Sequence, residues 1–243
     1  ADTVKKISLE LGGNAPFIVF ESADLKKAAA DAVVCKFRNA GQTCICANRI
    51  YVQDTVYDEF ASLLAENIKA MKVGPGVNAD TDIGPMINEQ GIEKVNAHIK
   101  DALAKGGELV CGGQPHDAGP LFFEPTLIRE MTLDMAIKDE ETFGPVAGLF
   151  RFTSEDEVIR EANDTIYGLS SSVYTDDLNE AMRVVNEMKF GETYVNRENF
   201  EAVDDRVDLD ECFEWPIGNA KSTVRDAFQE IFAGEPIEGL AHR

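Results

Sequence analysis

The side chains best suited to covalent chemistry surround two closely spaced cysteines. Cys44 and Cys46 lie one residue apart just after a glycine, and Arg38 precedes Cys44 by six positions. Nearer the start of the chain, Glu10 precedes a glycine pair. A thiol nucleophile, a carboxylate base and glycines that allow a substrate close to the backbone are the parts of covalent catalysis. These residues therefore make Cys44 a candidate nucleophile and Glu10 a candidate base.

Each of these residues also has an ordinary structural explanation. A buried structural thiol is more common than a nucleophile, and a lone Glu in a strand usually faces solvent. Arg38 at a helix end suits the helix dipole. Cys46 is either a second structural thiol or the partner of Cys44 in a strained, redox-active disulfide. No partner histidine for cysteine-protease chemistry is evident, and the residues alone leave these alternatives open.

A second candidate pair, Glu141 and Phe143, comes just before the turn at 144–145. A carboxylate can accept hydrogen bonds from ribose hydroxyls, and an aromatic ring can pack on a flat heterocycle. A turn that carries a core Phe explains the same residues. Spacing alone favours this structural explanation.

Composition narrows the class of protein. The chain has 243 residues, enough for one large or two modest domains, and a net charge of −21. This charge argues against nucleic acid or an anionic membrane as a partner. No apolar run approaches the ~20 residues of a membrane span, and the N-terminus lacks an apolar signal region. We therefore expect a cytoplasmic protein.

The cysteine and histidine positions do not predict a disulfide framework or a metal site. The cysteines are odd in number and scattered, without a secretory signal. They stand at Cys35, Cys44, Cys46, Cys111 and Cys212. One C-x-C pair and three isolated histidines lack the spacing of a metal site.

Strand and helix patterns alternate along the chain at the spacing of βαβ units. Alternating or apolar runs predict strands at 6–11, 16–20, 49–53, 108–111, 122–128, 146–152, 169–174 and 192–196. Helical periodicity predicts helices from a cap at 22–24 to about 37, and at 57–71, 89–105, 155–163 and 178–188. The predicted fold class is α/β, with an open, mostly parallel twisted sheet flanked by helices. Cys44 then follows the first helix, and Glu10 lies in the first strand.

Three motifs taken together resemble the aldehyde dehydrogenase superfamily. They are LELGG at 9–13, GQTC at 41–44 and ETFGP at 141–145, in the order and at the separations typical of the family. The resemblance covers roughly residues 4 to 200. It implies an aldehyde dehydrogenase-like catalytic domain over 1–202, which leaves an acidic C-terminal segment, 203–243, with no assigned fold. In that segment, 223–232 could form a helix.

The resemblance also implies a role for each candidate residue. Cys44 would attack an aldehyde to give a thiohemiacetal, hydride would pass to NAD or NADP, and Glu10 would activate the water that hydrolyses the resulting thioester. The backbone N–H of Cys44 would help to hold the oxyanion. Glu141 would bind the nicotinamide ribose, and Phe143 would pack beside the nicotinamide.

Two stretches resemble particular subfamilies. Residues 37–49 look most like succinate-semialdehyde dehydrogenase, which implies that Arg38 contacts a substrate carboxylate and that Cys44 and Cys46 form a redox-sensitive pair. Residues 190–201 look more like the lactaldehyde and glycolaldehyde dehydrogenases. The implied substrate is a small carboxylated aldehyde such as succinic semialdehyde. The resemblance leaves open whether the chain forms a homo-oligomer.

Two departures from the family pattern keep other functions open. The chain begins where the family's catalytic domain begins, without the N-terminal domain that carries most of the coenzyme site and the Asn that completes the oxyanion hole. After about Ala202 we find neither the Gly-rich closing motif nor the terminal oligomerisation strand. The alternatives are an isolated catalytic domain that is inactive alone, a thiol esterase that needs no coenzyme, and a structural or binding protein that keeps the fold.

Overall fold

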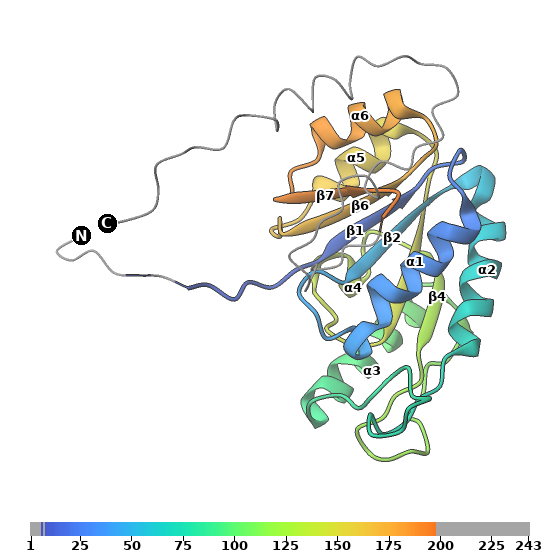
Figure 1. Ribbon diagram of the computed structural model, residues 1–243, viewed down its shortest axis with the longest axis vertical. Helices are drawn as coiled ribbons and strands as arrows, with labels where there is room; N and C mark the ends of the chain where they lie inside the picture. Colours follow the sequence, from blue (N-terminus) through green and yellow to red (C-terminus); the bar gives the residue numbers. More distant parts are fainter. Residues whose placement is uncertain (1–5, 7, 198–243) are drawn as a thin grey trace, which may run out of the picture. The chain divides into compact units, whose positions relative to one another are not determined.

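Seven strands form one sheet, in the order β3-β4-β5-β2-β1-β6-β7. Figure 1 shows this computed structural model as a ribbon. The structure describes residue 6 and residues 8–197. The strands are β1 (Ala15–Val19), β2 (Ala47–Gln53), β3 (Glu108–Cys111), β4 (Thr126–Met131), β5 (Val146–Phe152), β6 (Ser170–Tyr174) and β7 (Glu192–Val195). Only β3 runs antiparallel to its neighbour. The expected α/β fold with a mostly parallel sheet is confirmed.

The helices cover both faces of this sheet. They are α1 (Leu25–Phe37), α2 (Tyr57–Ala70), α3 (Glu89–Ala104), α4 (Ala136–Asp139), α5 (Glu155–Asn163) and α6 (Leu178–Glu187). The crossover from β1 to β2 runs toward β3, whereas those from β5 to β6 and β6 to β7 run the opposite way. Because such crossovers are right-handed, α1 and α2 lie on one face and α5 and α6 on the other (Figure 1).

Local sequence explains where the helices begin. The side chain of Asp24 accepts hydrogen bonds from the first turn of α1, and Asn88, Ser154 and Asp177 do the same for α3, α5 and α6. Such N-caps satisfy backbone N–H groups that have no partner inside the helix. The short polar residues that precede each apolar periodic run therefore mark these helix starts.

The core lies between the sheet and its helices, and β1 is buried along its whole length. Pro16 stands in this central strand, although proline cannot donate to a ladder. It is tolerated because the ladder to β6 begins only at Phe17, and the register to β2 shifts between Ala15 and Pro16. Burying each large side chain such as Phe17 contributes about 1.5–3 kcal/mol.

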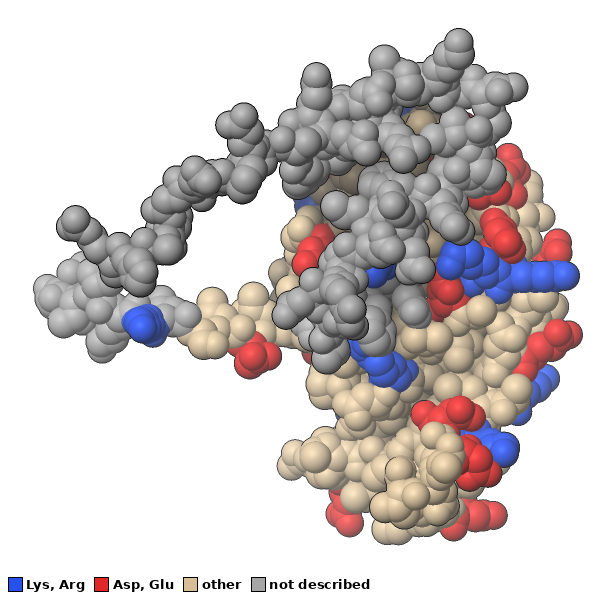
Figure 2. All heavy atoms as spheres, viewed as in Figure 1, with Lys and Arg blue, Asp and Glu red and all other residues tan. Residues whose placement is uncertain are grey.

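The surface is charged and mixed. Acidic and basic side chains are interspersed on the face shown in Figure 2. None of the helices in the described part of the chain is both long and apolar enough to cross a membrane.

Two sequence predictions need correction. The strand expected at 6–11 is wrong, because its described residues are exposed and not paired with the sheet; Leu9 is 69% exposed. Alternation of apolar residues does not make a strand without a neighbour to pair with. The strand expected at 122–128 begins only at Thr126. The helix suggested at 223–232 lies outside the described residues.

Candidate active site

The three motif segments meet at one edge of the sheet. Gly13 precedes β1, Cys44 precedes β2 and Glu141 precedes β5, and these strands are parallel. Tyr167 precedes β6 at the same edge. We call this the amino edge, because it is formed by the amino ends of the parallel strands. Residues more than 120 positions apart are therefore brought to one place.

The glycine pair packs directly against the other two motifs. A Cβ built on Gly13 would overlap the backbone carbonyl of Cys44, so no side chain fits there. A Cβ on Gly12 would lie 3.2 Å from both Glu141 Oε2 and the Tyr167 ring. The pair thus gives the close backbone approach that glycine alone permits.

A tight left-handed bend precedes the loop that carries Cys44 and Cys46, which we call the Cys44 loop. After α1, Asn39, Ala40 and Gly41 have φ angles of 53°, 57° and 73°. Such a conformation is costly for alanine and persists only where the surroundings enforce it. The side chains of Asn39 and Gln42 each donate to the other residue's carbonyl at 3.0 Å. Gln42 Oε1 also accepts from the Ile87 N–H at 2.8 Å, which ties the bend to a neighbouring loop.

The two cysteines of this loop have different surroundings. Cys44 is half-buried, whereas Cys46 is buried, and neither forms a disulfide with another described cysteine. Cys46 Sγ donates to the Gly41 carbonyl at 3.3 Å, and Lys36 Nζ donates to this sulfur at 3.7 Å. Lys36 is fully buried and has no carboxylate partner among the described residues. The more accessible thiol is the one predicted to be the nucleophile.

Glu141 and Phe143 lie at the same edge. Glu141 Oε1 accepts the Gly13 N–H at 3.1 Å, so it links two of the motifs. Burial raises the pKa of Glu141, although this hydrogen bond and the charges of Lys94 and Lys36 act in the opposite direction. Phe143 is 39% exposed and has a φ of 52°. The alternative in which Phe143 is a core residue is therefore wrong.

Glu10 and Arg38 are less tightly placed. Glu10 is exposed, and its carboxylate makes no hydrogen bond or ion pair with any described residue. The structure therefore does not show it at Cys44, although Gly13, three residues later, is in contact with that loop. Arg38 is half-buried and caps α1, with its backbone N–H donating to the Val34 carbonyl. This position agrees with the helix-end explanation and leaves its predicted contact with substrate untested.

Sequence analysis missed the buried polar residues beneath the site. Asn14, Asn48 and Arg49 are each at most 1% exposed. The guanidinium of Arg49 donates to the Asn14 carbonyl at 3.0 and 3.1 Å and to the Ala162 carbonyl at 2.9 Å. Polar residues at the start of apolar strands are the sequence signal that could have revealed these three residues, because buried polar groups need hydrogen-bond partners.

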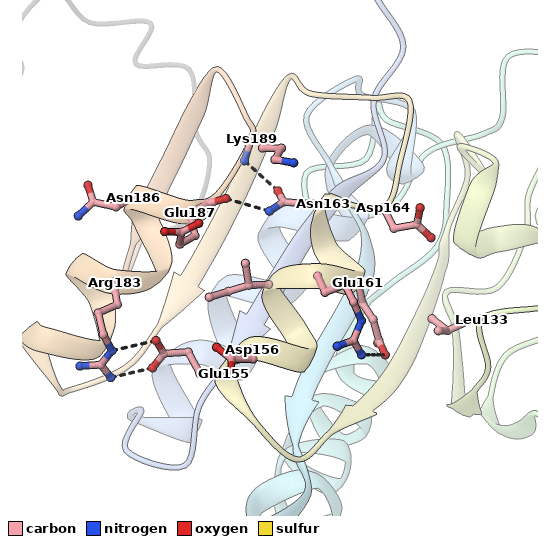
Figure 3. Close-up of a pocket in the computed structure, with 12 residues that line it drawn as sticks. Leu133, Glu155, Asp156, Glu161, Asn163, Asp164, Arg183, Asn186, Glu187 and Lys189 are labelled. Atoms are coloured by element: carbon pink, nitrogen blue, oxygen red, sulfur yellow. Dashed lines mark hydrogen bonds and ion pairs between the residues drawn. The ribbon is translucent and has the colours of Figure 1, made fainter.

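Two further features of the described residues can be compared with the predicted site. No cluster of His, Cys, Asp and Glu able to hold a metal ion occurs within 8–197. A hollow of about 1050 Å³ lies on the outer side of α5 and α6 (Figure 3). Its lining includes none of the predicted site residues.

Comparison with known proteins identifies the relatives of this chain. Residues 1–207 match the family model described as "Aldehyde dehydrogenase family". The chain is 54% identical over 196 residues to 3-sulfolactaldehyde dehydrogenase of Pseudomonas putida, covering 81% of the chain and 40% of that protein. It is 50% identical to succinate-semialdehyde dehydrogenase [NADP(+)] of Escherichia coli (strain K12), with 81% and 41% covered.

Solved structures agree with these relatives. Succinate-semialdehyde dehydrogenase from Burkholderia pseudomallei superposes with a TM-score of 0.81 at 48% identity, covering 82% of the chain and 42% of that structure. Lactaldehyde dehydrogenase from Escherichia coli gives a TM-score of 0.77 at 43% identity, with 79% and 41% covered. The chain thus spans about 40% of the length of these relatives.

Proposed function

The chain belongs to the aldehyde dehydrogenase family, and we propose that it supplies the thiol nucleophile for oxidation of an aldehyde to an acid with NAD or NADP. One observation carries this proposal: Gly13 packs on the Cys44 carbonyl while its N–H is held by Glu141. The thiol and the carboxylate expected to bind the coenzyme ribose therefore share one glycine. Because the chain spans about 40% of its relatives, the activity of a whole protein is part of the proposal.

The residues at the amino edge fit a nicotinamide coenzyme. Glu141 Oε1 is bound to Gly13, whereas Oε2 has no hydrogen-bond partner among the described residues, so it is available to a ribose hydroxyl. Phe143 offers an exposed ring face beside it. A bound NAD or NADP would supply the hydride acceptor. The E. coli relative named above carries NADP(+) in its name, which favours NADP.

Cys44 carries the covalent chemistry of the proposal. The Cys44 thiol loses its proton to solvent and its sulfur forms a bond to the aldehyde carbon, so that the carbonyl oxygen becomes an oxyanion that the Cys44 N–H helps to hold. Loss of hydride from that carbon leaves a thioester on the sulfur. Water then attacks the thioester carbon and the C–S bond breaks, which releases the acid and restores the thiol. Aldehyde, water and oxidised coenzyme are consumed, and acid, reduced coenzyme and a proton are formed.

Glu10 is the proposed base for the hydrolytic step. It would take a proton from the attacking water. Three residues of extended chain span about 10 Å, so Glu10 is tethered within that distance of Gly13 and its contact with the Cys44 loop. Its exposed position leaves it available to approach a bound thioester.

The proposed substrate is a small aldehyde with an anionic group, such as succinic semialdehyde. Succinate semialdehyde and 3-sulfolactaldehyde, named in two of the relatives, both carry an anionic group. Arg38, half-buried at the start of the Cys44 loop, would bind that group through its planar guanidinium. With a peroxide as the two-electron oxidant, Cys46 would act as the redox partner of Cys44: both S–H bonds break, a disulfide forms, the peroxide is reduced to water, and the nucleophile is removed.

Turnover with purified chain tests the proposal. We expect succinic semialdehyde, NADP and a thiol reductant to give reduced coenzyme, detected by absorbance, and Cys44→Ala to abolish it. If wild type and Cys44→Ala turn over equally, the proposal is wrong. If wild type gives no reduced coenzyme, the reactivity of its Cys44 toward iodoacetamide decides whether the chain carries a competent nucleophile.

A further inference from the structure

The amide of Asn48 joins three separate segments of the chain. It lies on β2, two residues after Cys46, and is 1% exposed. Its Nδ2 donates to Asn14 Oδ1 at 2.8 Å and to the carbonyls of Ile137 and Glu140, each at 3.2 Å. All of these partners are far from Asn48 in sequence.

The acceptor side of the same amide is also engaged. Asn48 Oδ1 accepts from Lys36 Nζ and from the Thr142 N–H, each at 3.4 Å. Lys36 in turn contacts the Cys46 sulfur. Asn14, for its part, donates from Nδ2 to the Lys138 carbonyl at 2.8 Å. A buried amide and its neighbours thus form one connected network.

These segments are the ones that carry the proposed chemistry. Asn14 directly follows the Gly13 that packs on Cys44. The residues on either side of Glu141 both bond to Asn48. The network therefore contacts the chain beside the Cys44 loop, beside Gly13 and beside Glu141.

We infer that Asn48 is a positioning residue that sets the placement of the Cys44 loop relative to Gly13 and Glu141. The inference rests on the proposed roles of Cys44 and Glu141. Only an amide offers two donors and an acceptor with two lone pairs on one short side chain. Because buried polar groups are costly to leave unpaired, no segment can shift without losing a hydrogen bond.

Asn163 provides a matched control. Its Nδ2 donates to the Glu187 carbonyl at 2.8 Å, and its Oδ1 accepts the Lys189 N–H at 2.8 Å (Figure 3). It therefore also ties together two distant segments, at the end of α5 and just after α6, but it contacts none of the site residues. Removal of either amide costs stability, and only removal of Asn48 should change the chemistry of Cys44.

The experiment compares wild type with Asn48→Ala, Asn14→Ala and Asn163→Ala. Melting temperature is measured first, and labelling is then done where each variant is folded. The rate of iodoacetamide modification at Cys44 is followed against pH by fragment-resolved mass spectrometry. In Asn48→Ala we expect that rate to fall about 10-fold or more, with a change in the pH profile of labelling that Asn163→Ala does not show.

The two controls make the outcome decisive. Asn163→Ala should lower the melting temperature yet leave the labelling rate of Cys44 within about twofold of wild type. Asn14→Ala, which removes part of the network, should lower the rate less than Asn48→Ala, and it decides the question if Asn48→Ala does not fold. The inference is overturned if the labelling rate of Cys44 is unchanged in Asn48→Ala, or in Asn14→Ala where Asn48→Ala does not fold. It is also overturned if that rate falls equally in Asn163→Ala. The proposed function is judged separately, because it fails if wild-type Cys44 labels no faster than Cys111.

Discussion

The two edges of the sheet are built from different interactions. At the amino edge, Gly13 packs on the Cys44 loop, and Glu141 Oε2 has no partner among the described residues. The carboxyl edge, formed by the opposite ends of the parallel strands, is a closed charge network. There Arg129 and Arg151 pair with four carboxylates: Asp54, Asp58, Glu108 and Glu130.

Tyr57 lies at the centre of the carboxyl-edge network. Its hydroxyl accepts the Glu130 N–H at 2.8 Å and donates to the Leu149 carbonyl at 3.1 Å. The Arg151 guanidinium carbon lies 3.7 Å from the centroid of its ring, in cation–π contact. Burial raises the pKa of Tyr57 to about 12, so the hydroxyl stays protonated and able to donate.

The contrast bears on where a site is expected in a parallel sheet. Open parallel sheets usually bind ligands at the carboxyl ends of their strands. Here that edge is filled by mutually satisfied charges, whereas the opposite edge keeps a half-buried thiol and a carboxylate with one open oxygen. The carboxylate oxygen left without a partner among the described residues, more than position in the fold, distinguishes the amino edge as the candidate site.

The largest effect is expected from Gly13→Ala at the amino edge. The added Cβ would overlap the Cys44 carbonyl, so the loop must move, and we expect labelling of Cys44 by iodoacetamide to fall about 100-fold. Gly76→Ala is the matched control, since a Cβ there meets nothing within 4 Å. If both variants label Cys44 like wild type, the close approach has no role in the reactivity of Cys44.

Removing one hydroxyl from the carboxyl edge should affect stability alone. Tyr57→Phe removes the hydroxyl that accepts the Glu130 N–H and donates to the Leu149 carbonyl, which costs about 1–3 kcal/mol of unfolding free energy. Urea unfolding measures this loss, and thiol labelling measures the site. A change in labelling of Cys44 larger than about twofold would contradict the separation between the two edges.

A smaller effect is expected from Glu141→Gln, and it depends on pH. Because burial raises the folded-state pKa of Glu141, the wild-type carboxyl favours folding when protonated and loses that contribution as pH rises through the folded pKa. Glutamine does not titrate, so the variant should gain stability relative to wild type as pH rises, by up to about 1 kcal/mol. Unfolding curves measured over a series of pH values that begins below the ordinary Glu pKa of about 4.3 measure the difference. A difference that does not vary with pH would count against burial as the cause.

The smallest effect is expected from Arg183→Ala, which is remote from both edges. Arg183 pairs with Glu155 through two hydrogen bonds of 2.8 and 2.7 Å between α6 and α5 (Figure 3). Its side chain is 55% exposed, so water screens the pair, and the loss of stability should be the smallest of the four and should shrink in high salt. A loss that salt does not change would show that packing, and not charge, holds this pair.

The sequence predicts much of this architecture because the information is local. Apolar periodicity and cap residues identify α2, α3, α5 and α6 to within about two residues. The strand prediction at 6–11 fails for the opposite reason, since a strand needs a neighbour that sequence alternation does not reveal. The start of β4 is set by its pairing with β5, which a local pattern cannot show.

The candidate site is predictable only in part. The motif residues Cys44, Glu141 and Phe143 are found from the sequence, and the structure brings their segments to one edge. Asn48 is not found, because its partners Asn14 and Glu140 lie 34 and 92 residues away. Its importance follows from burial and hydrogen bonding, which exist only in the folded chain.

The most direct test of the amino edge as the reactive edge is competitive labelling of the cysteines in the wild-type chain. Cys44 and Cys111 are both half-buried, and burial raises the pKa of Cys111. With limiting iodoacetamide at about pH 7.5, we predict that Cys44 labels at least about 10-fold faster than Cys111. Labelling of Cys111 at a rate equal to or above that of Cys44 would contradict the assignment of Cys44 as the nucleophile.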